Sequence, residues 1–109
     1  MNPPGFIVVG CYAGKSFEAK VSTGKYIGDS AAGHVKYRVD KNEPVKTRMK
    51  ASDKAMYFND MDNKFIKDLM NGQTKVVVQL MDYDYDTSIA TFTLKGSTAT
   101  INKVLDACK

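Results

Sequence analysis

The sequence predicts a single α+β domain over residues 1–109: an antiparallel β-sheet or sandwich of about six to seven strands, with two helices at about 60–71 and 97–108. The 109-residue chain is 43% hydrophobic and 26% charged, which supports one modest core and excludes a disordered chain. Most of its segments alternate apolar and polar residues, and only two show helical periodicity. The helices do not alternate regularly with strands, which argues against a parallel doubly wound sheet.

The first half of the chain is predicted to contain strands and connecting loops but no helix. In the run GFIVVGC, alternation places Ile7, Val9 and Cys11 on one side, and residues 16–22 can form a second strand. The segment HVKYRVD and residues 45–50 then alternate cleanly around the turn KNEP. These two segments predict a hairpin with one apolar and one basic face, and a short strand follows at 55–58.

The second half combines both helices with a further hairpin. Asn59 or Asp60 is the predicted cap of the first helix, and Asn71 followed by Gly72 is the predicted stop. The strongest strand candidates, residues 75–81 and 87–94, flank the motif MDYDYDTS, which we therefore interpret as a hairpin tip. Ser97 is the predicted cap of the last helix. Its apolar stripe follows the i, i+3, i+4, i+7 rule over Ile101, Val104, Leu105 and Cys108.

The two cysteines, Cys11 and Cys108, stand near opposite ends of the chain, and both fall on predicted apolar faces. A disulfide between them would join the first strand to the last helix, and an even cysteine count in a small domain is typical of an oxidising compartment. The alternative is two unpaired cysteines buried as small hydrophobic residues. We expect the disulfide, and with it a location in the periplasm or at the cell exterior.

Positive charge is concentrated in the first half of the chain. Residues 1–50 hold nine Lys and Arg against four Asp and Glu, whereas residues 51–109 hold seven against eight. The hairpin carries much of this excess in a predicted basic stripe, which is formed by Lys36, Arg38, Lys46, Arg48 and Lys50. The stripe is either a solvated sheet face or a binding surface for an anionic partner. Nucleic acid is the weakest such partner, because the aromatic residues of the hairpin point to its other face.

The acidic loop, residues 82–86, has three interpretations. Asp82, Asp84 and Asp86 match the start of a calcium loop, but the glycine and the twelfth-position glutamate of that loop are missing. A plain hairpin turn explains the aspartates, with Tyr83 and Tyr85 packing over the sheet end. A partner-contact surface explains the tyrosines, because exposed tyrosine is common in interface hot spots. We expect no metal site and include all five residues in a candidate contact surface.

The succession VKYRVD, KAMYF, FIKDLMNGQTKVVVQL, ATFTLKG and INKVLDAC resembles a periplasmic accessory family associated with type VI secretion, the TagO or VasI type. The likeness covers roughly residues 7–108, and residues 37–40 are its most specific part. Small proteins of this kind also occur in prophages and genomic islands. The resemblance implies accessory or adaptor work in the cell envelope, without catalytic residues. This sequence departs from the pattern in its acidic loop and in having no tryptophan.

We therefore expect a non-enzymatic binding or adaptor domain that contacts a protein of the cell envelope. The alternative is an inhibitor whose acidic loop acts on a cell-wall hydrolase or an incoming phage component. The single histidine, His34, and the absence of nucleophile or phosphate-loop motifs argue against an enzyme, a cofactor or a small-molecule substrate. No apolar run approaches the ~20 residues that span a bilayer. The short start over residues 1–4 leads us to expect that an export signal or membrane anchor was removed.

Overall fold

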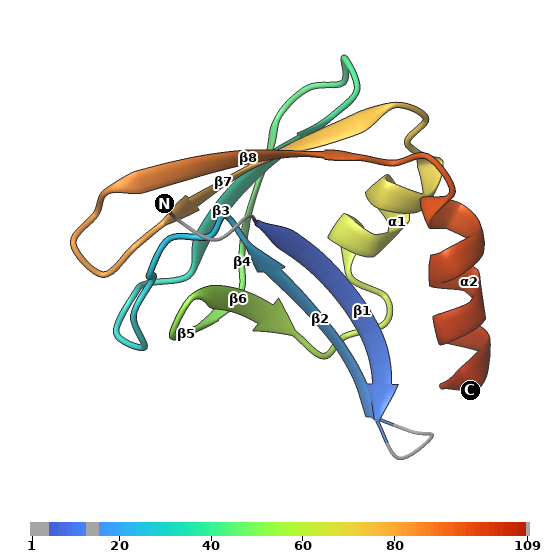
Figure 1. The fold of residues 1–109 in the computed structure, drawn as a ribbon, viewed down its shortest axis with the longest axis horizontal. Coiled ribbons are helices and arrows are strands. Elements are labelled where there is room, and N and C mark those ends of the chain that lie inside the picture. Colours follow the sequence, from blue (N-terminus) through green and yellow to red (C-terminus); the bar gives the residue numbers. More distant parts are fainter. Residues whose placement is uncertain (1–4, 13–15, 109) are drawn as a thin grey trace.

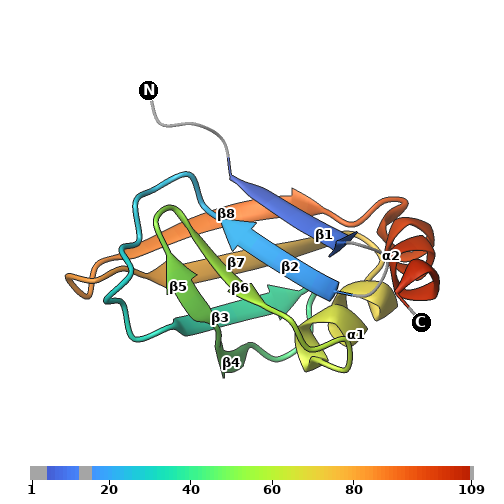
Figure 2. The same cartoon turned by 90° about the horizontal axis from the view of Figure 1, so that it is seen from below.

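Two four-stranded antiparallel sheets and two helices make up the fold, in a computed structural model that describes residues 5–12 and 16–108. The predicted α+β class is confirmed. The first sheet has the order β1-β2-β6-β5 and the second sheet the order β4-β3-β7-β8 (Figure 1, Figure 2). The elements are β1 (Phe6–Tyr12), β2 (Ser16–Ser22), β3 (His34–Val39), β4 (Val45–Arg48), β5 (Lys50–Ser52), β6 (Ala55–Phe58), α1 (Lys64–Asn71), β7 (Lys75–Met81), β8 (Thr87–Thr93) and α2 (Ser97–Ala107). The signal or anchor expected around residues 1–4 lies outside the described residues.

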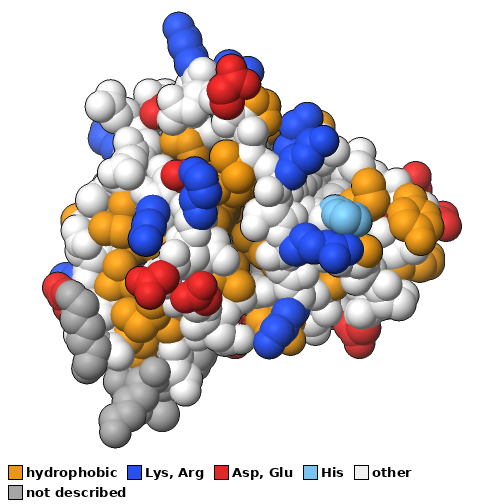
Figure 3. All heavy atoms as spheres, turned by 180° about the vertical axis from the view of Figure 1, so that it is seen from behind, with side chains coloured by type: hydrophobic (Ala, Val, Ile, Leu, Met, Phe, Trp, Pro, Cys, Tyr) orange, Lys and Arg blue, Asp and Glu red, His pale blue; other side chains and the backbone are white. Residues whose placement is uncertain are grey.

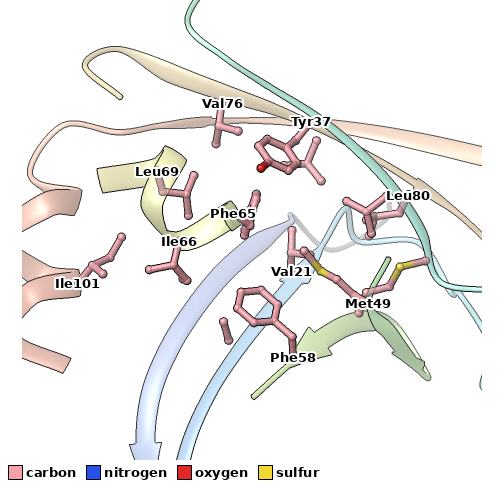
Figure 4. Packing of buried hydrophobic residues seen from close by; sticks show 14 of the residues in the cluster. Val21, Tyr37, Met49, Phe58, Phe65, Ile66, Leu69, Val76, Leu80 and Ile101 are labelled. Atoms are coloured by element: carbon pink, nitrogen blue, oxygen red, sulfur yellow. The ribbon is translucent and has the colours of Figure 1, made fainter. Parts of the chain in front are cut away.

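The hydrophobic core lies between the two sheets and is covered at one end by the helices (Figure 2, Figure 4). Strand β7, between β3 and β8, buries Val76, Val78 and Leu80 completely, because alternate side chains of a strand face the same side. Helix α1 places the ring of Phe65 edge-on against the ring of Tyr37, with centroids 4.8 Å apart. The outward residues of β3 and β7 therefore form an open sheet surface.

Asp40 fixes where β7 begins relative to β3. It follows β3 with a positive φ of 53°. Its carboxylate accepts hydrogen bonds of 2.9–3.0 Å from the backbone N–H groups of three consecutive residues, Gln73, Thr74 and Lys75. These donors lower the pKa of the Asp40 carboxyl, because they stabilise its charged form. The resulting register places Tyr37 opposite Val78.

The strand predicted over residues 45–50 is in fact two strands in different sheets, which raises the strand count to eight. Between β4 and β5, Met49 is buried and its N–H donates to the Gly33 carbonyl at 2.9 Å. Gly33 has a φ of +87°, and a Cβ there would lie 2.1 Å from the Met49 carbonyl oxygen. Only glycine permits this approach. Alternation of exposed and buried residues continues through Met49, so the sequence pattern does not reveal the change of sheet.

Helix α1 begins later than predicted, and the predicted N-terminal caps, Asn59 and Asp60, are wrong, whereas the predicted end at Asn71 and Gly72 is confirmed. Asn63 is the N-cap, and its side chain accepts a hydrogen bond of 2.8 Å from the Phe65 N–H. Asn59 instead donates its amide to the Phe17 carbonyl at 3.0 Å, and Asp60 lies in a turn ahead of the helix. Asparagine and aspartate cap turns as readily as helices, so the sequence offered several equivalent starts.

Helix α2 follows Gly96, which is its N-cap with a φ of 79°, so the prediction of Ser97 as the cap is wrong. A left-handed glycine at this point turns the chain sharply from β8 into the helix. Cys108 comes directly after α2, is buried, and forms a disulfide with Cys11 of β1 across a Cα–Cα distance of 5.7 Å. The alternative of two unpaired thiols is set aside. No helix within the described parts of the chain meets the length and apolarity needed to cross a membrane.

The disulfide closes a loop between residues 97 positions apart. We expect Cys11→Ala combined with Cys108→Ala to lower the free energy of unfolding by about 4–5 kcal/mol, because the unfolded chain regains the entropy of that loop. Urea unfolding of the oxidised protein, the reduced protein and the double variant measures this loss. Equal unfolding midpoints for the oxidised and reduced proteins would contradict the expectation.

Candidate functional site

The acidic loop between β7 and β8 is held in shape by Asp82. The Asp82 carboxylate accepts hydrogen bonds from the backbone N–H groups of Asp84 at 2.8 Å and Asp86 at 3.0 Å. Its own N–H donates to the Asp86 carbonyl at 2.8 Å, and Tyr85 takes a positive φ of 63°. This pattern fixes the loop conformation from within. Of the three aspartates predicted to form a surface, Asp82 is turned inward.

Lys25 completes the surroundings of Asp82. The Lys25 ammonium lies 3.1 Å from Asp82 Oδ2 and 4.0 Å from an Asp86 oxygen, and the Asp82 side chain is only 5% exposed. Burial raises the pKa of Asp82. The hydrogen bonds from Lys25 and from the two backbone N–H groups lower it more, so the pKa lies below its ordinary value. The Asp82 carboxylate is thus already occupied by donors from the protein itself.

Metal coordination has no candidate among residues 5–12 and 16–108, where no three His, Cys, Asp or Glu side chains are grouped closely enough to hold an ion. In the acidic loop this follows from the role of Asp82. A calcium ion there would have to displace the Lys25 ammonium and two backbone N–H donors from a single carboxylate.

The two tyrosines of the acidic loop are exposed in different directions. Tyr83 packs edge-on against Tyr26 with ring centroids 6.0 Å apart, and its N–H donates to the Ile27 carbonyl at 2.8 Å. Tyr85 is 76% exposed and lies beside the outward face of the second sheet. Asp86, 70% exposed, and Asp84 present their carboxylates to solvent. The loop therefore offers one exposed ring and two carboxylates on a fixed backbone.

The basic stripe is only partly assembled. The hairpin of β3 and β4 pairs antiparallel as predicted, with Lys36 directly opposite Lys46, and Arg48 opposite His34. Arg38 lies on the same face of β3, and its guanidinium donates to a backbone carbonyl of the following turn. The fifth residue, Lys50, belongs to β5 of the other sheet and lies 6.0 Å from the centroid of the Tyr57 ring. Four of the five predicted residues thus share one face of the hairpin, but only Lys36 and Lys46 line the same groove, whereas Arg48 lines another hollow together with Lys50 and Arg38 lines a third.

Lys36, Lys46 and Arg48, called the cationic cluster below, carry uncompensated charge. Within the described residues, no carboxylate lies within 4.0 Å of any of the three. Like charges directly opposite each other destabilise a pair of strands. Figure 3 shows the single histidine among Lys and Arg side chains, with hydrophobic and acidic side chains beyond it at the end of the molecule. This arrangement costs stability and leaves a positive field at the surface.

A groove of about 400 Å³ is lined by Lys36 and Lys46 of the cationic cluster and by Tyr85 of the acidic loop. Gln79 and Met81 of β7 also line it. Two surfaces that were predicted separately therefore meet. Sequence reasoning missed His34, Gln79 and Met81 as members of this site. Alternation placed each on an outward face, but only the register of β3 against β7 places His34 and Lys36 beside them.

A second groove, of about 460 Å³, lies over the first sheet and differs in its electrostatics. It is lined by Glu18, Lys20 and Asp53 among others. Lys20 is 3.2 Å from Glu18, so the charges there are largely compensated within the protein. The groove on the second sheet is the better candidate for a binding site, because its cations have no partner in the described chain.

Comparison of the chain with family models, with curated proteins and with solved structures found no match. The candidate site is therefore described from its own geometry alone.

We expect Asp82→Asn to lower the thermal midpoint near neutral pH, because the loop loses its ion pair with Lys25. The Asp82 anion is favoured by the fold. Its contribution is therefore complete above the unfolded-state pKa of about 3.9 and is lost as the pH falls through the lower folded-state pKa. Thermal melts from neutral pH down to about pH 2 should show a shallower acid dependence in the variant.

Asp84→Asn is the matched control, because it removes an exposed carboxylate from the same loop. Its melts should follow the wild type at every pH. Identical acid dependence for wild type and Asp82→Asn would show that the Asp82 charge does not stabilise the loop.

Proposed function

We propose that the protein is a non-enzymatic binding or adaptor domain that acts outside the cytoplasm and contacts a protein of the cell envelope. The observation that carries this proposal is that the unpaired Lys36 and Lys46 line one groove together with the exposed Tyr85. Tyrosine and arginine are enriched at interface hot spots, and unpaired surface charge promotes association with a partner of opposite charge. The like charges of Lys36 and Lys46 lower the stability of the sheet, and a role of these residues in binding would explain why both are present.

The compartment is argued from the disulfide. Bonded cysteine pairs persist in oxidising surroundings and are rare in reducing ones. The Cys11–Cys108 bond therefore supports an extracytoplasmic location, and the periplasm is the specific compartment that we propose. The resemblance to the type VI secretion accessory family supports an envelope partner of that kind, in a secretion, prophage or island setting.

We expect Lys36→Glu to change stability and partner binding in opposite directions. The new carboxylate would lie opposite Lys46, so we expect the free energy of unfolding to rise by about 0.2–1 kcal/mol while partner binding is lost. Urea unfolding measures the first effect. Photo-crosslinking from Gln79, which lines the groove opposite Lys36, in the envelope fraction of the producing cells, measures the second.

Lys103→Glu is the matched control for this experiment, because it makes the same charge change at an exposed site on α2, which lies at the opposite end of the molecule from the acidic loop (Figure 1). Its crosslinks should equal those of the wild type. Crosslinked proteins that are unchanged by Lys36→Glu, or the recovery of DNA in place of protein, would count against the proposal.

An inhibitor is the second candidate, and the fixed conformation of the acidic loop favours it. Asp84 and Asp86 are exposed on a backbone that Asp82 already orders, so little conformational entropy would be lost on binding. Such a loop fits the cationic cleft of a cell-wall hydrolase or of an incoming phage component.

Combined Asp84→Asn and Asp86→Asn should weaken such inhibition by about tenfold, through loss of two ion pairs. The measurement is the rate of cell-wall lysis by a purified hydrolase with a cationic cleft, at increasing concentrations of the protein. Lys36→Glu is the control that keeps the acidic loop intact and should inhibit like the wild type. Lysis rates that do not respond to the wild-type protein would remove this candidate.

A further inference from the structure

Charges of opposite sign adjoin along one groove of the second sheet. Lys36 and Lys46 line it together with Tyr85, which belongs to the loop that carries Asp84 and Asp86. The cations have no carboxylate within 4.0 Å in the described chain, and no cation lies that close to Asp84, whereas Asp86 lies 4.0 Å from Lys25. Cations thus line the groove, and the exposed Asp84 and Asp86 flank its lining residue Tyr85 in the chain, so charges of both signs lie in or beside the groove.

This polarity disfavours ligands of a single sign. A lipid surface or a nucleic acid carries negative charge throughout, so contact with Lys36 and Lys46 would bring it toward Asp84 and Asp86. Charges at a protein surface act over a Debye length of about 8 Å at physiological ionic strength, so the acidic loop would oppose such a ligand at close range. A uniformly positive ligand would be attracted by Asp84 and Asp86 but repelled by the cationic cluster. A narrow chain carrying both signs avoids both penalties.

The remaining lining residues suit a polypeptide. Gln79, which lies opposite Lys36, can donate to and accept from a peptide backbone. Met81 and Tyr85 offer apolar surface for side chains between the charged ones. The volume of about 400 Å³ falls within the usual range of ligand sites.

We propose that this groove binds an extended protein segment whose acidic residues lie between Lys36 and Lys46, and whose following basic residue meets Asp84 and Asp86. The inference rests on the proposed binding function and deepens it, since it states the charge order of the segment that the partner supplies. Alternate residues of an extended segment face the same side, so acidic side chains two positions apart would both reach the cationic side.

The probe is an eight-residue capped peptide with two glutamates in its first half and two lysines in its second half, the other positions being threonine or glycine. A permuted peptide of identical composition, in which glutamate and lysine alternate, is its control. Binding to the isotope-labelled protein is followed by amide chemical shifts. We expect the ordered peptide to bind about fivefold more tightly than the permuted one, with shifts at the groove and the acidic loop.

Variants of the protein test which of its charged residues contact each half of the peptide. Lys36→Glu should abolish the preference for the ordered peptide, and so should the combined Asp84→Asn and Asp86→Asn change. Lys103→Glu, an exposed position on α2 at the opposite end of the molecule from the acidic loop, should keep it (Figure 1). Unchanged amide spectra away from the substituted sites establish that each variant is folded.

The proposal is overturned if an all-glutamate peptide, an oligothymidylate or anionic phosphatidylglycerol vesicles bind as tightly as the ordered peptide, because the acidic loop would then contribute nothing. Equal binding of ordered and permuted peptides also overturns it. If envelope crosslinks still depend on Lys36 in that case, only the charge order is wrong. If they do not, the binding function fails as well.

Discussion

The register between β3 and β7 decides both the interior and the surface of this protein. Side chains alternate along a strand, so a shift of one residue would move Val76, Val78 and Leu80 to solvent and bring Gln79 and Met81 inside. Asp40 prevents that shift, because its carboxylate binds three consecutive backbone N–H groups where β7 begins. The core, the open face of the second sheet and the groove all depend on this contact.

The two charged surfaces contribute differently to stability. In the acidic loop, Asp82 is fully engaged with Lys25 and two backbone N–H groups, so part of what looks like a charged surface is an internal support. In the hairpin, Lys36 and Lys46 lie opposite each other and gain nothing from the described fold. A residue pair that costs stability at an exposed position is better explained by what it contacts outside the molecule. Because Asp82 is engaged within the protein and the two lysines are not, the proposed function is argued from the lysines.

Local patterns in the sequence were sufficient for most elements. The alternation of HVKYRVD predicted β3 and its pairing with β4, and the apolar positions of Cys11 and Cys108 predicted which faces would meet. Features that depend on contacts between residues far apart in the sequence could not be predicted. The change of sheet at Met49 depends on the Gly33 carbonyl, and the true cap of α1 depends on which of several equivalent side chains finds its N–H partner. The groove could not be predicted either, because it depends on how three strands are aligned with one another.

The disulfide also determines how the molecule would respond to mechanical load. A pull applied ahead of β1 and at the end of α2 passes along residues 6–11 and through the Cys11–Cys108 bond, without crossing the chain between the two cysteines, which lie 97 positions apart. Among the described strands, only the pairing of β1 with β2 therefore lies on the path of the load. The second sheet, with its open face and its groove, is thereby kept off the path of the load.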